Sequence, residues 1–341
     1  MKVVSPEIGC GRASFKIVLD KAERSTGKSM KIFMLAIGLV LALSSQGNAS
    51  PAPEVVVTIA PLHSLVQGVM GDTGNAKLLV QGKKSPHDFQ LKPSQMALLQ
   101  QARVVFYIGE NLETFLGRAL ESLPEQVDKV AMVDQPDMTI LAVREGGEWE
   151  NHEHDDHQEG NAHDHHDHEE LGDPHIWLDP INAIAMIKAI TRELSKIHPQ
   201  NRAVYKENAL SMISKIEASD ERVKSMLIPV KNTPFVVFHD AYQYFGERYG
   251  LSAVGSIVLE PGDAASAKRI TELRQKVKET GAVCIFREPQ FSDKLSLVVA
   301  EGATVKLGTL DPLGSQLSPG PGLYSDLLEE IADGMVICLQ N

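Results

Sequence analysis

Short runs of β-branched and other apolar residues alternate with segments of helical periodicity along most of the chain. One series of such pairs covers residues 55–123, and a second covers residues 235–310. Alternation of this kind is typical of βα units, whose parallel strands are covered by helices. We therefore expect an α/β protein with two parallel-sheet lobes.

A single long helical pattern separates the two series. Between Pro199 and Pro229, apolar residues recur at steps of three and four, and no Gly or Pro interrupts them. This pattern predicts one long rigid helix over residues 198–229, joining an N-terminal lobe over 50–197 to a C-terminal lobe over 230–341. Because open parallel sheets bind ligands beyond the carboxyl ends of their strands, we expect a site in the cleft between the lobes.

The first apolar run of the chain has a different character. Residues 32–43 are uncharged and apolar, follow Lys31, and precede the small residues Gly47 and Ala49. The run is shorter than the roughly 20 residues of a membrane span, and it has the layout of a secretory signal peptide. The alternative is a buried core helix. We expect a cleavable signal peptide over 30–49.

Export through this signal would place the mature protein in the periplasm of a Gram-negative bacterium. We expect the mature chain to begin near Ser50 and Met30 to be the true start, so that residues 1–29 are an upstream extension that is not translated or is removed. Cys10 lies in that extension, and no apolar run precedes it as a lipid anchor would need.

Export leaves two cysteines in an oxidising compartment, Cys284 and Cys338. We expect one disulfide, which would close a loop of some 55 residues and stabilise the fold by about 4 kcal/mol in the chain-entropy model. The alternative is two buried free thiols.

The chain is acidic, and one segment carries much of the charge. The formal net charge of −12 argues against nucleic acid or an anionic membrane as a partner and favours cations. Residues 145–170 contain eleven acidic residues and seven histidines but no Lys or Arg, and they cannot bury a core. We expect a disordered loop that either binds zinc weakly, as an antenna or a sensor, or is merely solvated. Its auxiliary metal ligands would be His152, His154, His157, His163, His165, His166 and His168.

Four candidate metal ligands lie outside that loop, in positions compatible with the carboxyl ends of strands. They are His87 in SPHDF, His175 in DPHIWLDP, His239 after FVVF, and Asp311 in GTLDPLG. Three imidazoles and one carboxylate suit a tetrahedral borderline cation such as Zn2+. Each histidine taken alone is more often a core or capping residue than a ligand. We expect a helix-start or cleft-rim role for His63 and a surface position for His198.

These motifs together resemble a known family. PHDF followed by LKPSQ, the acidic His-rich loop, DPHIWLDP, FHDAYQYF, EPQF and GTLDPLG are similar in kind and order to those of the periplasmic zinc-binding proteins of bacterial ABC importers, the ZnuA type. The resemblance covers residues 54–339. It implies that His87, His175 and His239 bind the metal and that Asp311 or a water completes the shell.

Two departures from relatives bear on the metal. Some zinc-binding relatives have a Glu directly before the first histidine, where this chain has Pro86. Manganese-binding relatives have a Glu where this chain has His239, and replacing a carboxylate by an imidazole moves preference toward zinc.

The resemblance implies a monomeric, non-enzymatic protein that captures Zn2+ as cargo in the periplasm and delivers it to the ABC permease of the inner membrane. A periplasmic zinc chaperone is a further expected partner, and nucleic acid is not. The alternatives are a manganese-binding importer protein, a zinc-dependent periplasmic hydrolase, and a general metal buffer that relies on the loop. The sequence contains no HExxH or similar motif, so nothing in it supports the hydrolase.

Overall fold

The computed structural model describes residues 54–144, 172–259, 261 and 266–340. The expected signal peptide, the upstream extension with Cys10, and the histidine-rich loop over 145–170 lie outside these residues. Within the described parts of the chain, none of the helices combines the length and the hydropathy that crossing a membrane requires.

Two four-stranded parallel sheets organise the described chain, and they share one strand order. The first runs β2-β1-β3-β4 and the second runs β6-β5-β7-β8, so in each sheet the chain reverses its direction across the sheet after the second strand. This confirms the expected α/β class with two parallel sheets. The strands are β1 Val55–Val57, β2 Lys77–Leu78, β3 Val104–Tyr107, β4 Asp128–Ala131, β5 Phe235–Val237, β6 Ala253–Ser256, β7 Cys284–Arg287 and β8 Lys306–Thr309.

The central strands are short and apolar because they are covered on both faces. Val55, Val56 and Val57 of β1 are all buried, and β1 pairs in register with β3, Val56 lying opposite Val105. Alternating side chains point to opposite faces of a sheet, so a strand covered on both sides must be apolar throughout.

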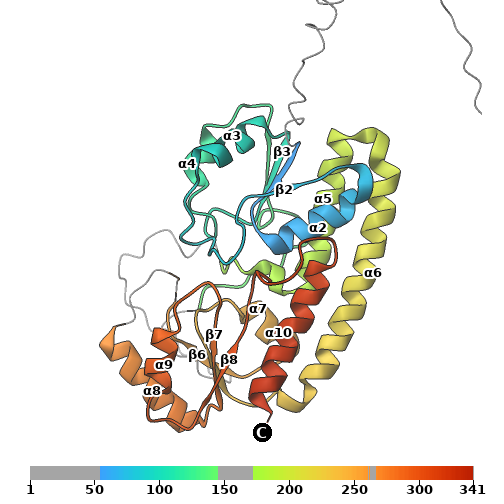
Figure 1. Ribbon diagram of the computed structural model, residues 1–341. Helices are drawn as coiled ribbons and strands as arrows, with labels where there is room; N and C mark the ends of the chain where they lie inside the picture. The colour runs from blue at the N-terminus through green and yellow to red at the C-terminus, as the bar shows by residue number, and fades with distance from the viewer. Residues whose placement is uncertain (1–53, 145–171, 260, 262–265, 341) are drawn as a thin grey trace, which may run out of the picture. The chain divides into compact units, whose positions relative to one another are not determined.

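The helices pack on both faces of each sheet (Figure 1). They are α2 Ala60–Met70, α3 Pro93–Gln101, α4 Gly117–Glu121, α5 Pro180–Ile197, α6 Arg202–Leu227, α7 Gln243–Tyr249, α8 Ala267–Thr280, α9 Lys294–Ala300 and α10 Leu323–Leu339.

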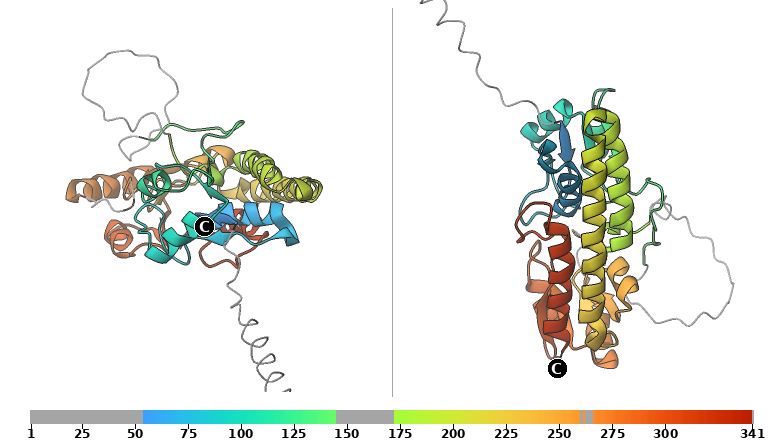
Figure 2. Two further views of the ribbon diagram at one scale, coloured as in Figure 1. Left: turned by 90° about the horizontal axis from the view of Figure 1, so that it is seen from above. Right: turned by 90° about the vertical axis from the view of Figure 1, so that its right-hand side faces the viewer.

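Helix α6 connects the part of the chain that forms the first sheet to the part that forms the second. It has 26 residues, or about 39 Å at 1.5 Å per residue, and packs against α5, α10 and α2 (Figure 2). Together with a 3-10 turn at each end, α6 forms the long helix expected between the two series of βα units. Pro199 and Pro229 lie in 3-10 turns, η3 Pro199–Asn201 and η4 Ile228–Val230, because proline cannot continue a regular helix.

One buried apolar cluster joins the inner faces of both sheets through these helices. It contains Val57 of β1, Ile216 of α6, Phe235 of β5 and Tyr324 of α10. Separate clusters fill the outer faces, under α3 and α4 for the first sheet and under α8 and α9 for the second. The shared cluster holds the carboxyl ends of β1 and β5 near one another.

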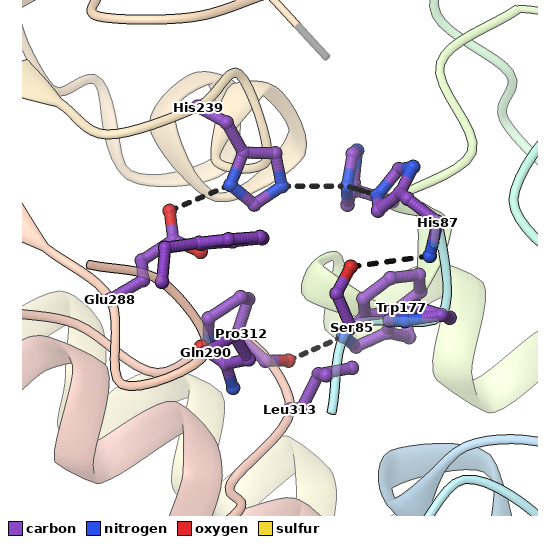
Figure 3. A pocket seen from close by; sticks show the side chains of 11 residues that line it. Ser85, His87, Trp177, His239, Glu288, Gln290, Pro312 and Leu313 are labelled. Atoms are coloured by element: carbon purple, nitrogen blue, oxygen red, sulfur yellow. Dashed lines mark hydrogen bonds and ion pairs between the residues drawn. The ribbon is translucent and has the colours of Figure 1, made fainter. Parts of the chain in front are cut away.

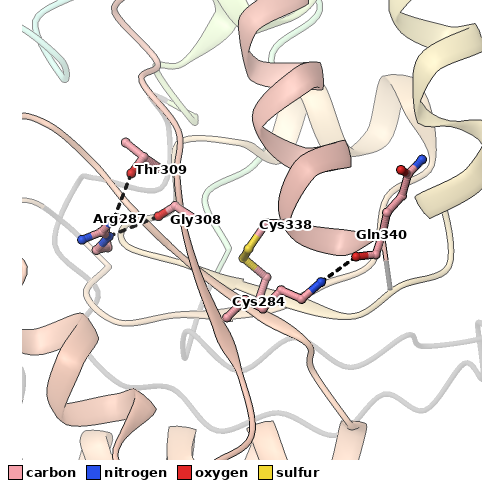
Figure 4. Close-up of a disulfide and its surroundings, with 7 residues drawn as sticks. Cys284, Arg287, Gly308, Thr309, Cys338 and Gln340 are labelled. Atoms are coloured by element: carbon pink, nitrogen blue, oxygen red, sulfur yellow. Dashed lines mark hydrogen bonds between the residues drawn. A yellow bond between two sulfur atoms is a disulfide. The ribbon is translucent and has the colours of Figure 1, made fainter.

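A disulfide joins Cys284 of β7 to Cys338 of α10, as expected, with Cα atoms 6.0 Å apart (Figure 4). Both residues are buried. Nearby, Lys306 Nζ donates to the carbonyl oxygen of Gln340 at 2.6 Å. A disulfide and a hydrogen bond at its C-terminal end therefore hold the last helix against the second sheet.

Candidate metal centre

The three candidate histidines come from three different kinds of local structure. His239 lies two residues after β5, as the strand-end argument predicts. His87 lies in the loop between β2 and α3. His175 directly precedes the 3-10 turn η2 Ile176–Leu178 and does not follow a strand. The strand-end rule therefore applies directly to His239 alone among the three.

The imidazoles of these histidines nevertheless converge, and Figure 3 labels two of them, His87 and His239. His175 Nε2 lies 3.2 Å from His87 Nε2 and 3.3 Å from His239 Nε2. One nitrogen from each ring lies within 4.8 Å of the other two, and among the described residues this group could hold a metal ion. A tetrahedral ion with Zn–N distances of about 2.0–2.1 Å has ligand–ligand edges of about 3.3–3.4 Å, close to the two measured separations.

Two buried carboxylates orient two of the rings. His175 Nδ1 lies 2.8 Å from Asp173 Oδ1, and His239 Nδ1 lies 2.7 Å from Glu288 Oε1. With the proton on Nδ1, each ring donates to its carboxylate and leaves Nε2 as the ligand atom, the arrangement common at protein metal sites. The two negative charges would balance a divalent cation.

Burial distinguishes His87 from the other two histidines. His175 and His239 are each 3% exposed, whereas His87 is half-buried. Its backbone N–H donates to Ser85 Oγ at 3.2 Å. The following Phe89 is buried and packs edge-on against Phe115, with ring centroids 5.0 Å apart, which anchors this loop on the first sheet's side.

Aromatic side chains and the loop after β8 form the wall of the pocket around the imidazoles. Trp177 lies against His175, with ring centroids 5.3 Å apart, and Phe291 lies against His239 at 5.7 Å. Trp177 Nε1 donates to the carbonyl oxygen of Pro312 at 2.8 Å, which ties the segment after His175 to that loop. Such surroundings limit the access of water.

Asp311 lies beside this pocket, with its carboxylate already hydrogen-bonded. Oδ1 accepts from Gln290 Nε2 at 2.7 Å and from the backbone of Leu313 at 3.1 Å, and Oδ2 accepts from the backbone N–H and the hydroxyl of Ser315, both at 2.7 Å. It is not part of the three-histidine group. In this geometry Asp311 organises the loop that carries Pro312.

The remaining histidines of the described chain have other contacts. His63 lies in α2, where its Nε2 is 3.1 Å from the carbonyl oxygen of Ala76, and burial lowers the pKa of this imidazole. His198 Nε2 is 3.0 Å from Glu54 Oε2.

Some acidic residues near the histidine motifs contact the imidazoles, whereas others stabilise the surrounding structure. Asp179 caps α5, accepting from the Ile181 N–H, and Asp240 pairs with Arg144. Neither Asp173 nor Glu288 is among the candidate residues expected from the sequence. The D-x-H spacing of Asp173 and His175 was an available signal, whereas only the fold brings Glu288 to His239.

Comparisons with known proteins cover most of this chain. A family model described as "Zinc-uptake complex component A periplasmic" matches residues 55–338. The high-affinity zinc uptake system protein ZnuA of Brucella suis is 39% identical, over 92% of this chain and 100% of that protein. ZnuA of Paracoccus denitrificans is 40% identical, over 88% of this chain and 97% of that protein.

Solved structures of related proteins have a similar fold. A zinc-bound ZnuA deletion mutant has a TM-score of 0.70 and 25% identity, over 85% of this chain and 99% of that one. The zinc-bound ZnuA-like domain of Streptococcus pneumoniae AdcA has a TM-score of 0.62 and 26% identity, over 83% of this chain and 98% of that one. Because the family match spans both sheets and all three converging histidines, this chain belongs to the ZnuA family of periplasmic zinc-uptake components.

Proposed function

We propose that this protein captures Zn2+ in the periplasm and delivers it to an ABC permease for uptake. The observation that carries the proposal is the convergence of His87, His175 and His239, because the Nε2 atom of His175 lies at the spacing of tetrahedral ligands from the Nε2 atoms of the other two. The names of its relatives, high-affinity zinc uptake proteins, support the same cargo.

The fourth ligand is an oxygen. Because the Asp311 carboxylate already accepts hydrogen bonds from Gln290, Leu313 and Ser315, we assign the fourth position to solvent in this geometry. Asp311 as a direct ligand stays a prediction, and it requires the carboxylate to leave those partners.

The site favours capture over catalysis. Asp173 and Glu288 are engaged by the Nδ1 atoms of His175 and His239, so neither is placed as a general base toward a zinc-bound water. Two carboxylates that balance the charge of the ion and three neutral nitrogens suit reversible binding of zinc as cargo. This assignment disfavours the hydrolase and, through His239, the manganese alternative.

Five further proposals rest on the sequence alone. They are the lobe limits at 50–197 and 230–341, cleavage of a signal peptide near Ser50, a monomeric state, exchange with a zinc chaperone, and weak zinc binding by the loop over 145–170. N-terminal sequencing of the exported protein tests the cleavage. Zinc stoichiometry before and after deletion of the loop tests its role.

Zinc titration against a competing chelator tests the main proposal. The wild type should bind one zinc ion tightly, and His87→Ala should lose that site. His198→Ala is the matched control, since it removes a histidine whose partner is Glu54, outside the site. Zinc at a thousandfold excess over Kd should also stabilise the fold by about 4 kcal/mol. A wild type without a tight site, or a tight site that survives His87→Ala, would contradict the proposal.

A further inference from the structure

Tyr244 joins two backbone segments that lie far from it in the sequence. It belongs to α7, which begins four residues after His239, and its side chain is buried. Its hydroxyl donates to the carbonyl oxygen of Asp173 at 2.7 Å and accepts from the backbone N–H of Leu141 at 3.0 Å. The N–H of Asp173 in turn donates to the carbonyl oxygen of Leu141 at 2.8 Å. One hydroxyl thus closes a ring of three hydrogen bonds.

Asp173 is the residue through which this ring reaches the metal site. Its Oδ1 accepts from the backbone N–H of His175 at 2.9 Å and lies 2.8 Å from Nδ1 of the same residue. The position of this carboxylate therefore sets both the backbone and the ring of His175. Any shift of Asp173 moves His175 Nε2 relative to the other two ligand atoms.

Two further side chains, those of Gln243 and Asn111, hold Asp173 and the residue before it in place. Gln243, the first residue of α7, places its amide 3.0 Å from Asp173 Oδ2 when the nitrogen is oriented toward that oxygen. From the first sheet's side, Asn111 Nδ2 donates to the carbonyl oxygen of the preceding Gly172 at 2.9 Å. Gly172 has φ of +66°, a conformation that glycine adopts without strain. The start of α7 thus holds Asp173 by its backbone and by its side chain.

We propose that Tyr244 is a positioning residue for zinc capture, which holds His175 in its ligand geometry through Asp173. This inference rests on the proposed function and deepens it. Metal ligands must be held to within about 0.5 Å of the productive geometry, and groups behind the ligands typically change metal affinity 10- to 100-fold. Removal of the Tyr244 hydroxyl leaves the Leu141 N–H and the Asp173 carbonyl without this partner, so Asp173 can move.

The test compares Tyr244→Phe with Tyr249→Phe. Tyr249 lies on the same helix, is also buried, and donates its hydroxyl to Asp220 Oδ1 at 2.9 Å, away from the three histidines. Both variants should lower the melting temperature of the metal-free protein. Tyr244→Phe alone should weaken zinc binding about tenfold by chelator competition and change the visible absorption spectrum of the Co2+-loaded protein, while Tyr249→Phe stays within twofold.

A cycle with Asp173→Ala tests whether Tyr244 acts through Asp173. In the Asp173→Ala background, Tyr244→Phe should cause little further loss of zinc affinity. If Tyr244→Phe is too unstable to titrate, Gln243→Met removes the other α7 contact to Asp173 and should weaken zinc in the same direction.

Several results would overturn the inference. They are unchanged zinc affinity in Tyr244→Phe, equal losses in Tyr244→Phe and Tyr249→Phe, full additivity with Asp173→Ala, and, where Tyr244→Phe cannot be titrated, unchanged affinity in Gln243→Met. A wild type that binds zinc weakly would instead count against the proposed function, so the two failures are distinguishable.

Discussion

His239 Nδ1 lies 2.7 Å from Oε1 of Glu288, a residue 49 positions later in the chain, and the two side chains are 3% and 2% exposed. The other oxygen of Glu288 has no hydrogen-bond partner among the described residues. A buried carboxylate with one partner is costly unless a nearby positive charge compensates it. We infer that the bound cation supplies that charge through the imidazole.

The first prediction follows from this pair. Glu288→Gln keeps an oxygen that can accept the Nδ1 proton but removes the negative charge, so zinc affinity should fall 10- to 100-fold in a chelator competition. Asp220→Asn is the control, because Asp220 is also a buried carboxylate and pairs with Arg248 outside the site. Equal zinc affinity in wild type and Glu288→Gln would show that this carboxylate does not act on the ligand.

The second prediction concerns selectivity. His239→Glu would exchange a neutral nitrogen for a charged oxygen, which favours harder cations, so the ratio of zinc to manganese affinity should fall. The new carboxylate would face Glu288, and this repulsion between buried charges should destabilise the metal-free protein.

The variant His239→Glu with Glu288→Gln removes that repulsion. It should recover stability while keeping the altered metal preference, measured by competitive titration of zinc against manganese. A zinc-to-manganese ratio equal to that of the wild type in both variants would mean that His239 is structural.

The third prediction concerns the disulfide between Cys284 and Cys338. Reduction should lower the free energy of unfolding of the zinc-free protein by about 4 kcal/mol, because the bridge spans 54 positions and restricts the unfolded chain. Guanidinium unfolding with and without reductant measures this. The Cys284→Ala/Cys338→Ala variant should not respond to reductant. A wild-type midpoint that reductant leaves in place would contradict the stabilising role.

The fourth prediction concerns Glu113, which is buried between the ends of β1 and β3. Burial raises the pKa of its carboxyl to about 7, although hydrogen bonds from Thr58 Oγ1 and the backbone of Ile108 and Gly109 act in the opposite direction. An unfolded glutamate has a pKa of 4.5, so between pH 4.5 and 7 the native state retains a proton that the unfolded chain releases. Stability should therefore fall as pH rises through this window, by about 3 kcal/mol from this group.

Urea unfolding of metal-free wild type and Glu113→Gln at pH 4.5 and 7.5 isolates this contribution. The variant cannot ionise, so its stability should change less than that of the wild type over the same interval. Identical pH dependence in the two proteins would place the Glu113 pKa near its ordinary value.

Hydrophobic periodicity was sufficient to predict most of the fold. The sheet strands β1, β3, β5 and β7 are buried apolar runs, which the sequence displays directly. Strand β4 was missed because its first two residues, Asp128 and Lys129, are exposed, so the run has little apolar character. Helix α4, in the last βα pair of the first series, has only five residues, since the chain before it turns to bring Glu113 back to the strand ends.

The site was predictable only in part. Residue type and motif identified His87, His175 and His239, and the structure brings their Nε2 atoms together. The carboxylate partner of His239 and the hydroxyl of Tyr244 act across 49 and 71 positions, respectively. Contacts at such separations depend on how the sheets and helices pack, and a local pattern does not encode them.

Diffraction from zinc-loaded crystals at the zinc absorption edge shows whether the three histidines hold the metal. We expect an anomalous peak about 2.0–2.1 Å from the Nε2 atoms of His87, His175 and His239, with an oxygen in the fourth position. The same map shows whether that oxygen belongs to solvent or to Asp311. A zinc-loaded crystal with no peak among the three imidazoles, or with its principal peak on other residues, would contradict a three-histidine zinc site.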